Sequence, residues 1–154
     1  MDELNEILGG DLGETQGKYL TFCVGEEEYG MAIDFVSEII GIQEITDVPD
    51  IPSYIKGLIN LRGKIIPVMD VRIRFNKPPQ EYDDRTCIIV VNHMNTSIGL
   101  IVDTIRDVLD IDDSLIGDPA GAKTGTPNRY IESIARTDHG NKLLINLEKV
   151  LSDH

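Results

Sequence analysis

The sequence predicts a mainly β fold made of two small barrels of about five strands each, preceded by a flexible tail. The β-branched residues isoleucine and valine are unusually common, and such side chains fit the half-buried surface of a sheet. Short apolar runs are separated by turn signals along most of the chain. The two halves of the chain also repeat each other, and closing each half into a barrel would remove its exposed strand edges.

The regular elements are expected from Lys18 onward. Residues 1–17 are polar and rich in glycine, which disfavours a stable helix, so this segment is predicted to be a flexible tail. Apolar and polar side chains alternate from Lys18 to Val24, as is typical of a strand. Further strands are expected over residues 29–33, 36–42, 54–61, 64–71, 86–91, 97–102, 105–111, 131–137 and 142–147, and a short helical turn over 148–151.

Glycine and proline mark the connections. The strands on either side of Arg62 and Gly63 are joined by these two residues alone, which predicts a tight hairpin. Pro67 cannot donate a backbone hydrogen bond, so its strand is expected at an edge or a bulge. Residues 76–80 form the clearest linker, and residues 112–129 form a long loop rich in Gly, Pro and Asp.

An internal repeat is the most informative pattern in the chain. Residues 29–42 align without gaps on residues 98–111, and Gly30 then falls on Gly99. Each copy is followed by a turn-rich loop and a hairpin. Two barrels of similar construction would explain this duplication.

The composition excludes several classes of function. The formal net charge is −13, from 27 acidic and 14 basic residues, so the surface should repel nucleic-acid phosphates and anionic membranes. No stripe of Lys and Arg with interleaved aromatic residues occurs, and nucleic-acid binding is not expected. The chain starts Met1-Asp2-Glu3 and contains no apolar run of about 18 residues, so a soluble cytosolic protein without membrane insertion is expected.

Two pairs of carboxylates are the first candidates for catalysis or metal binding. On a helix, Asp34 and Glu38, or Asp103 and Asp107, would share a face and could hold one cation. The surrounding residues read as strand, where four residues span about 13 Å. Turn capping by Asp34 and Asp103, with the other two exposed, is therefore the preferred interpretation, and a small carboxylate- or metal-dependent enzyme is kept as the alternative.

Other reactive residue types give no convergent site. Cys23 and Cys87 lie in apolar runs and are expected to be small buried side chains rather than ligands or disulfide partners. The segment 117–124 resembles a phosphate-binding loop, but Ala122 stands where a glycine must precede the lysine. The histidines are too scattered for a ligand set and are expected on the surface: His93, His139 and His154.

Arg62 is the one residue whose chemistry favours binding to a partner. It lies at the tip of an apolar hairpin in an otherwise acidic protein. Its guanidinium can form planar, bidentate hydrogen bonds, and arginine is enriched among the residues that anchor interfaces.

With these residues in view, the chain resembles the CheW family of chemotaxis coupling proteins. The resemblance covers about residues 18–151, in ordered spacing. Its most specific part is the hairpin segment Asn60-Leu-Arg-Gly63 followed by Pro67-Val-Met-Asp70. The other matching segments are Lys18-Tyr-Leu-Thr-Phe22, Glu28-Tyr-Gly30, Val36-Ser-Glu-Ile39, Ile55-Lys-Gly-Leu-Ile59, Val71-Arg72, Gly99-Leu-Ile-Val-Asp103 and Leu143-Leu-Ile-Asn-Leu147.

The resemblance implies two five-stranded, SH3-like β-barrel lobes packed on a shared hydrophobic core. The first lobe is expected over about residues 18–78 and the second over about 84–151, and a crossover of the terminal strands is left open. The family's domain also occurs inside the CheA kinase and fused to a receiver in CheV proteins. Because this chain ends near Leu151 without such a segment, the stand-alone coupling form is expected.

The resemblance implies a non-catalytic adaptor that couples chemoreceptors to the histidine kinase CheA. Such an adaptor binds the cytoplasmic receptor tip in a groove between the lobes and pairs with the regulatory domain of CheA by end-to-end barrel contacts. It is cytoplasmic and recruited to membrane-associated receptor arrays, it needs no cofactor, and rings with further CheW copies are left open. The matching positions are Ile33, Val36, Glu38, Ile39, Gly99 and Val102 for the receptor groove, and Gly57, Asn60, Arg62 and Gly63 for the coupling hairpin.

Overall fold

The computed structural model describes residues 17–119 and 128–152 of the chain. The expected flexible tail (except for Gly17), most of the segment 117–124 and His154 lie outside these residues. The elements, in chain order, are β1 (Lys18–Val24), β2 (Glu27–Ala32), η2 (Ile33–Phe35), β3 (Val36–Gly41), β4 (Ile55–Leu61), β5 (Lys64–Asp70), α2 (Val71–Arg74), β6 (Cys87–His93), β7 (Thr96–Val102), β8 (Thr104–Asp110), η3 (Asp113–Leu115), β9 (Ile116–Gly117), η4 (Asn128–Tyr130), β10 (Ile131–Thr137), β11 (Gly140–Ile145) and α3 (Leu147–Leu151).

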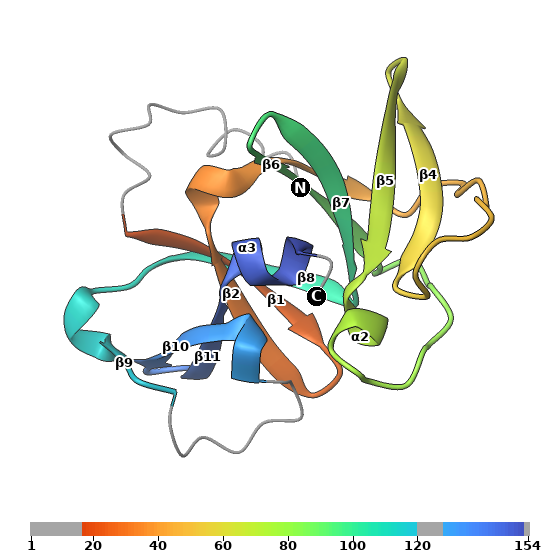
Figure 1. Cartoon of the computed structure of the whole chain (residues 1–154). Helices are drawn as coiled ribbons and strands as arrows, with labels where there is room; N and C mark the ends of the chain where they lie inside the picture. Colours follow the sequence, from red (N-terminus) through yellow and green to blue (C-terminus); the bar gives the residue numbers. More distant parts are fainter. Residues whose placement is uncertain (1–16, 120–127, 153–154) are drawn as a thin grey trace.

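The strands form two sheets, which confirms the mainly β fold (Figure 1). The first sheet has six strands in the order β8-β1-β2-β11-β10-β9, and we call it barrel 1. The second has five strands in the order β3-β6-β7-β5-β4, and we call it barrel 2. The expected helical turn near the C-terminus is present as α3.

In each sheet, the chain that follows one edge strand pairs with a strand at the opposite side of the sheet. Beyond β3, Thr46 exchanges two backbone hydrogen bonds with Leu58 of β4, at 2.8 and 2.9 Å, and this bridge closes barrel 2. In barrel 1 the chain of β8 continues through η3 into β9, which pairs with β10 at the opposite side of the sheet. Closure of this kind leaves few exposed strand edges.

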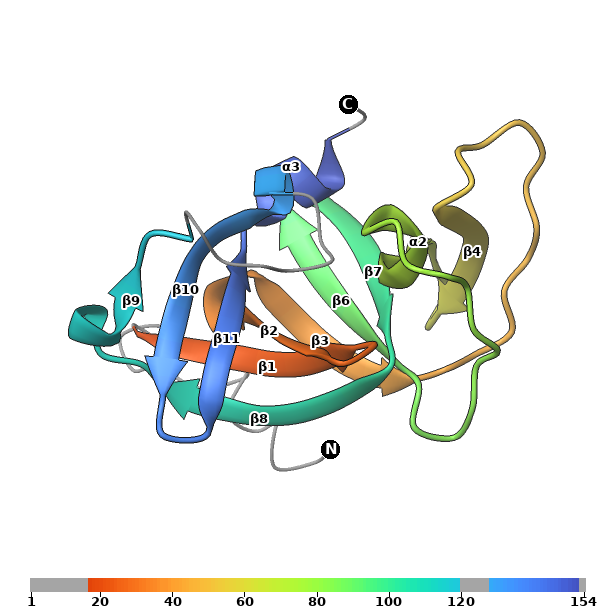
Figure 2. The ribbon, with the colours of Figure 1, turned by 90° about the horizontal axis from the view of Figure 1, so that it is seen from below.

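Barrel 2 is inserted in the chain between two strands of barrel 1. After β2 the chain crosses through η2, and β3 pairs with β6 in barrel 2. After β7 it crosses back at Asp103, and β8 runs alongside β1 in barrel 1 (Figure 2). Barrel 2 is therefore a continuous segment from β3 to β7, and barrel 1 combines the strands before and after it.

The repeat seen in the sequence relates the two barrels. The offset of 69 residues that places Gly30 on Gly99 also places β2 on β7, and these two glycines take part in the parallel pairs β2–β11 and β7–β5. A second offset, which places Tyr54 on Tyr130, relates the two following hairpins. Both hairpins carry a register shift at the same place, between Ile55 and Gly57 in one and at the corresponding residues of β10 in the other.

Apolar side chains fill three connected regions. Each barrel has its own interior, built around Ile59 and Val90 in barrel 2 and around Ile111 and Leu144 in barrel 1. The largest cluster lies between the barrels and takes side chains from both sheets and from α3. The shared core expected from the family resemblance is thus present, and four aromatic rings contact one another through it in succession: Phe22, Tyr29, Phe75 and Tyr130.

The position of Pro67 differs from the expectation. Its strand, β5, lies between β7 and β4 and is not an edge strand. The ladder between β5 and β7 begins only at Val68, opposite Gly99, so Pro67 lies just beyond it and no ladder donor is lost on that side. Beyond this point the β4–β5 and β6–β7 hairpins diverge toward their tips (Figure 1).

Candidate functional site

The β4–β5 hairpin has the tight turn that its sequence predicts. Arg62 and Gly63 both have positive φ angles, 52° and 85°. This is the backbone of a type I′ turn, whose twist matches that of the flanking strands. The Oδ1 atom of Asn60 accepts a hydrogen bond from the backbone N–H of Gly63 at 2.9 Å and holds the turn.

The structure brings Arg62 together with Glu38, a residue expected in the receptor groove. The guanidinium Nη2 of Arg62 donates to Glu38 Oε2, and the carboxylate raises the pKa of Arg62. The Arg62 side chain is 69% exposed and that of Glu38 is 24% exposed. Because one edge of Arg62 remains in solvent, the pair can still contact a partner protein.

Beside this pair the end of barrel 2 is hollowed, and we call this depression the barrel-2 mouth. Its floor is apolar, and its rim carries charged and polar side chains from β3, β5, β6 and β7. Lys64 Nζ donates to Ser97 Oγ at 2.9 Å, and Ser97 Oγ donates to Asn92 Oδ1 at 2.6 Å. The lining residues are Ser37, Glu38, Leu61, Arg62, Lys64, Ile66, Val90, Asn92 and Ser97.

Gly57, expected in the coupling hairpin, is buried at the base of β4. Its φ angle of 146° lies in the region that favours glycine, and a Cβ atom there would overlap the carbonyl oxygen of Thr46. The same Thr46 oxygen accepts the bond from Leu58 N–H that closes barrel 2. The geometry therefore indicates a structural role for this glycine.

Five of the six positions matched to the receptor groove are buried. Val36, Ile39 and Val102 belong to the core between the barrels, and Ile33 is 2% exposed. Gly99 is packed so closely that a Cβ would lie 2.7 Å from Ile88 Cγ2. These residues shape the surface above them, and Glu38 is the member of the set that reaches the solvent.

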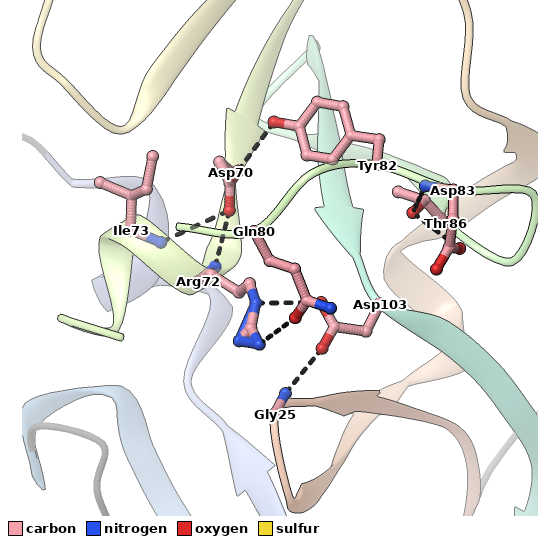
Figure 3. Close-up of polar contacts among 9 residues, drawn as sticks. All are labelled: Gly25, Asp70, Arg72, Ile73, Gln80, Tyr82, Asp83, Thr86 and Asp103. Carbon is pink, nitrogen blue, oxygen red and sulfur yellow. Dashed lines mark hydrogen bonds and ion pairs between the residues drawn. The ribbon is translucent and has the colours of Figure 1, made fainter. Parts of the chain in front are cut away.

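A polar cluster that the sequence did not reveal lies at the crossover from β7 to β8 (Figure 3). Asp103 Oδ2 accepts from the N–H of Gly25 at 2.8 Å, and Asp103 Oδ1 is 3.4 Å from Arg72 Nε. Arg72 also donates to Gln80 in the linker. The cluster ties the β1–β2 turn of barrel 1 to α2 of barrel 2, and the bond to Gly25 agrees with the turn capping expected of Asp103, whereas its pairing with Arg72 was not predicted.

Asp70 and Tyr82 complete this region. The Asp70 carboxylate caps α2 by accepting from the N–H groups of Arg72 and Ile73, and its second oxygen accepts from the Tyr82 hydroxyl at 2.7 Å. Burial and this hydrogen bond raise the pKa of Tyr82. The contact between Tyr82 and Asp70 holds the segment between α2 and β6 against barrel 2 (Figure 3).

A buried arginine joins the two short helices. Arg74 of α2 donates from Nε to the carbonyl of Val150 at 2.9 Å and from Nη2 to the carbonyl of Ser152, at the end of α3. Its guanidinium lies 4.2 Å from the ring centroid of Tyr54 and 5.2 Å from that of Tyr130. These contacts compensate the buried charge of the guanidinium and give hydrogen-bond donors to the carbonyl groups at the C-terminal end of α3.

The carboxylates of the alternative enzyme hypothesis do not form one site. Glu38 pairs with Arg62, whereas Asp103 contacts Arg72 and Gly25 at the crossover from β7 to β8. Asp107 caps its own neighbour, since its Oδ1 accepts from the N–H of Val108. Within residues 17–119 and 128–152, no three His, Cys, Asp or Glu side chains come together as a metal site.

The expected cysteines and histidines have ordinary surroundings. Cys23 and Cys87 are free thiols and are half-buried rather than fully buried. His93 packs edge-on against Phe35, with ring centroids 6.1 Å apart, and His139 lies exposed in the β10–β11 turn. None of the helices that the structure describes is long and apolar enough to span a bilayer.

Comparison with known proteins gives consistent matches along the chain. The CheW-like domain matches residues 18–154. The chemotaxis protein CheW of Klebsiella aerogenes is 35% identical over 141 residues, which cover 91% of this chain and 85% of that protein. The chemotaxis protein CheW of Bacillus subtilis is 35% identical over 139 residues, 90% of this chain and 88% of that protein. The crystal structure of the scaffolding protein TtCheW from Thermoanaerobacter tengcongensis superposes with a TM-score of 0.82 at 36% identity, covering 88% of this chain and 92% of that one.

Proposed function

The chain belongs to the family of CheW-like domains, and from this premise we propose that it is a non-catalytic adaptor that couples chemoreceptors to the histidine kinase CheA in bacterial chemotaxis. The observation that carries this proposal is the match of the CheW-like domain to nearly the whole chain. It is supported by relatives named chemotaxis protein CheW and by the likeness to a scaffolding protein in fold. A scaffold works through its surfaces and needs no convergent catalytic side chains.

We propose further that the partners are the cytoplasmic tip of the receptors and the regulatory domain of CheA, in arrays at the membrane. Contacts with further copies of the chain in rings are part of the same proposal. In the matched set Asn60, Arg62 and Gly63 are exposed and Glu38 is half-buried, and we assign direct partner contacts to the side chains of Glu38, Asn60 and Arg62. The buried members hold the strands beneath them, and their substitution would act through packing.

The test is size-exclusion chromatography of the chain mixed with CheA and with a receptor signalling fragment, run beside Arg62→Ala and Arg136→Ala. Arg136 is an exposed arginine of barrel 1 and serves as the matched control. We expect the wild-type chain and the control to elute with both partners, and Arg62→Ala to bind more weakly. Its thermal transition should stay within a few degrees, because exposed substitutions usually cost less than about 0.5 kcal/mol.

The outcomes distinguish the adaptor function from the role of the hairpin in it. If the folded wild-type chain elutes with neither partner, the adaptor function is refuted. If Arg62→Ala elutes as the wild type does, the adaptor function stands but the hairpin is not at the interface.

A further inference from the structure

The two barrels are built alike at the ends where α2 and α3 begin. Tyr19 of β1 pairs with Ala32 of β2, and Ile88 of β6 pairs with Ile101 of β7. Both members of the second pair follow those of the first by the repeat offset of 69 residues. The two pairs therefore occupy the same place in their barrels.

The strands that lead into the two short helices match in the same way. Leu144 of β11 and Val68 of β5 lie opposite the two equivalent glycines of the repeat. Two residues further along the chain, Asn146 caps α3 and Asp70 caps α2. Four positions of barrel 1 thus have counterparts in barrel 2: Tyr19 and Ile88, Ala32 and Ile101, Leu144 and Val68, Asn146 and Asp70.

In barrel 2 this place is filled by the side chain of Tyr82. The ring packs against the interior cluster of barrel 2, to which Val68 and Ile88 belong, and the hydroxyl donates to Asp70 at 2.7 Å. Tyr82 lies only five residues before Cys87, the first residue of β6. The segment that precedes the first strand of the repeat therefore closes barrel 2 at this end.

In barrel 1 the same place is a cavity of about 240 Å³. The four counterpart positions of barrel 1 all line it. A further wall is formed by Phe35 of η2 and His93 of β6, whose half-buried rings lie 6.1 Å apart between centroids. In the part of the chain that the structure describes, the place that Tyr82 fills in barrel 2 is thus hollow in barrel 1.

The duplication also indicates which segment would fill this cavity. β1 is the counterpart of β6, since the repeat offset places Lys18 on Cys87. The segment that corresponds to the one carrying Tyr82 is therefore the segment before β1, residues 1–17.

Within this segment one apolar side chain lies at the matching distance from β1. The repeat offset places Tyr82 on Gly13, and Leu12 is the large apolar residue next to it. Leu12 precedes Gly17 by five residues, which can span about 17 Å when extended. Tyr19, two residues beyond Gly17, already lines the cavity, so Leu12 can reach it.

We propose that Leu12 inserts its side chain into this cavity and acts as an internal, releasable plug of barrel 1. Glu132 and Glu148 are exposed residues at the edge of the cavity, and Asp11 and Glu14 lie close to Leu12 in the sequence. These like charges oppose the apolar contact, and salt would screen them. Leucine also lacks the hydroxyl that ties Tyr82 to Asp70, so this plug is held less firmly than the one in barrel 2.

The plug would connect the N-terminal segment to both barrels. Phe35 belongs to η2, the crossover from barrel 1 into barrel 2, and His93 ends β6 of barrel 2. Insertion of Leu12 between these rings and Tyr19 would hold the crossover, and its release would loosen it. This device is a property of the chain by itself and goes beyond the adaptor function proposed above.

The test is nuclear magnetic resonance of the full chain with labelled leucine methyl groups. We expect nuclear Overhauser effects (NOEs) between the methyl groups of Leu12 and the ring protons of Tyr19 and Phe35. Leu12→Ser should lower the ratio of plugged to open cavity at least about tenfold, as for the loss of one buried leucine, and should shift the resonances of both rings. Leu4→Ser, the matched control in the same segment, should leave the NOEs and the ring resonances unchanged.

A second pair of variants tests the charge at the edge of the cavity. Glu132→Lys replaces a repulsive side chain by an attractive one and should strengthen the NOEs from Leu12. Glu81→Lys makes the same change of charge at an exposed residue of the linker and should not. Added salt should strengthen the NOEs of the wild-type chain and not those of Glu132→Lys.

Absence of these NOEs from the folded wild-type chain and from Glu132→Lys would overturn the plug. NOEs from Leu4, Ile7 or Leu8 in place of Leu12 would overturn the choice of side chain. NOEs that arise only between differently labelled copies would assign the cavity to a second chain and overturn an internal plug. An equal effect of Glu132→Lys and Glu81→Lys would refute the place given to Leu12 beside Glu132.

Discussion

Replacement of Gly57 by alanine should open barrel 2 without touching its exposed surface. The new Cβ would overlap the Thr46 carbonyl oxygen and would lie 2.9 Å from Ile45 Cγ2. The strand beyond β3 would have to move away from β4. The two hydrogen bonds between Thr46 and Leu58 would then be lost together.

The expected cost follows from two effects. A side chain at positive φ costs about 1–2 kcal/mol. Each lost hydrogen bond contributes about 0.5–1.5 kcal/mol. The free energy of unfolding should therefore fall by roughly 2–5 kcal/mol, a large part of the about 5–15 kcal/mol typical of a domain.

Urea unfolding followed by circular dichroism measures this change, with Gly41→Ala as the matched control. Gly41 is also a strand glycine of barrel 2, but a Cβ there would meet no atom within 4 Å. We expect the control to stay within about 0.5 kcal/mol of the wild type. Equal urea midpoints for Gly57→Ala and Gly41→Ala would refute the reasoning, and loss of partner binding by fully folded Gly57→Ala would give this glycine a direct role at the interface.

Three further predictions concern single side chains. Met94→Asn should raise the free energy of unfolding by up to about 1 kcal/mol in urea melts, because asparagine tolerates positive φ; a lower urea midpoint would contradict this. The raised pKa of Tyr82 means that the hydroxyl ionises more readily in the unfolded chain, so stability should be fully present below about pH 10 and fall as the pH rises further. Tyr82→Phe, which removes the bond to Asp70, should make this decline shallower in melts between pH 9 and 12, and an unchanged slope would count against it. Arg74→Ala should lower stability by about 3–5 kcal/mol through lost charged hydrogen bonds and ring contacts, whereas exposed Arg85→Ala should have little effect in the same thermal melts.

Local chemistry made the hairpins and the duplication predictable from the sequence. Arg62 and Gly63 can only connect two strands by a tight turn, and the observed φ angles confirm it. The alignment of Gly30 with Gly99 reflects a real spatial equivalence, since each glycine allows a parallel strand to approach closely. Such features depend on a few neighbouring residues, and this is why the sequence reveals them.

Long-range pairing left no comparable signal. The pair Glu38–Arg62 forms because β3 and β4, the two edge strands of the barrel-2 sheet, are brought together when the barrel closes, and no local pattern specifies that closure. Pairing between strands distant in the chain also makes β5 an internal strand despite Pro67. The contact between Arg72 and Asp103 likewise joins segments that are far apart in the sequence. Apolar character alone also could not separate groove residues from core residues.

The insertion of barrel 2 into barrel 1 has a mechanical consequence for an adaptor. Barrel 2, from β3 to β7, lies in the chain between β2 and β8 of barrel 1, so the chain joins the two barrels at two crossings. Asp103 adds a polar contact at one crossover, and the core fills the space between the sheets. A displacement applied to one barrel is therefore passed to the other as a movement of the whole body. The β4–β5 and β6–β7 tips project beyond this framework (Figure 1), so their side chains can be fitted to a partner at little cost to the fold.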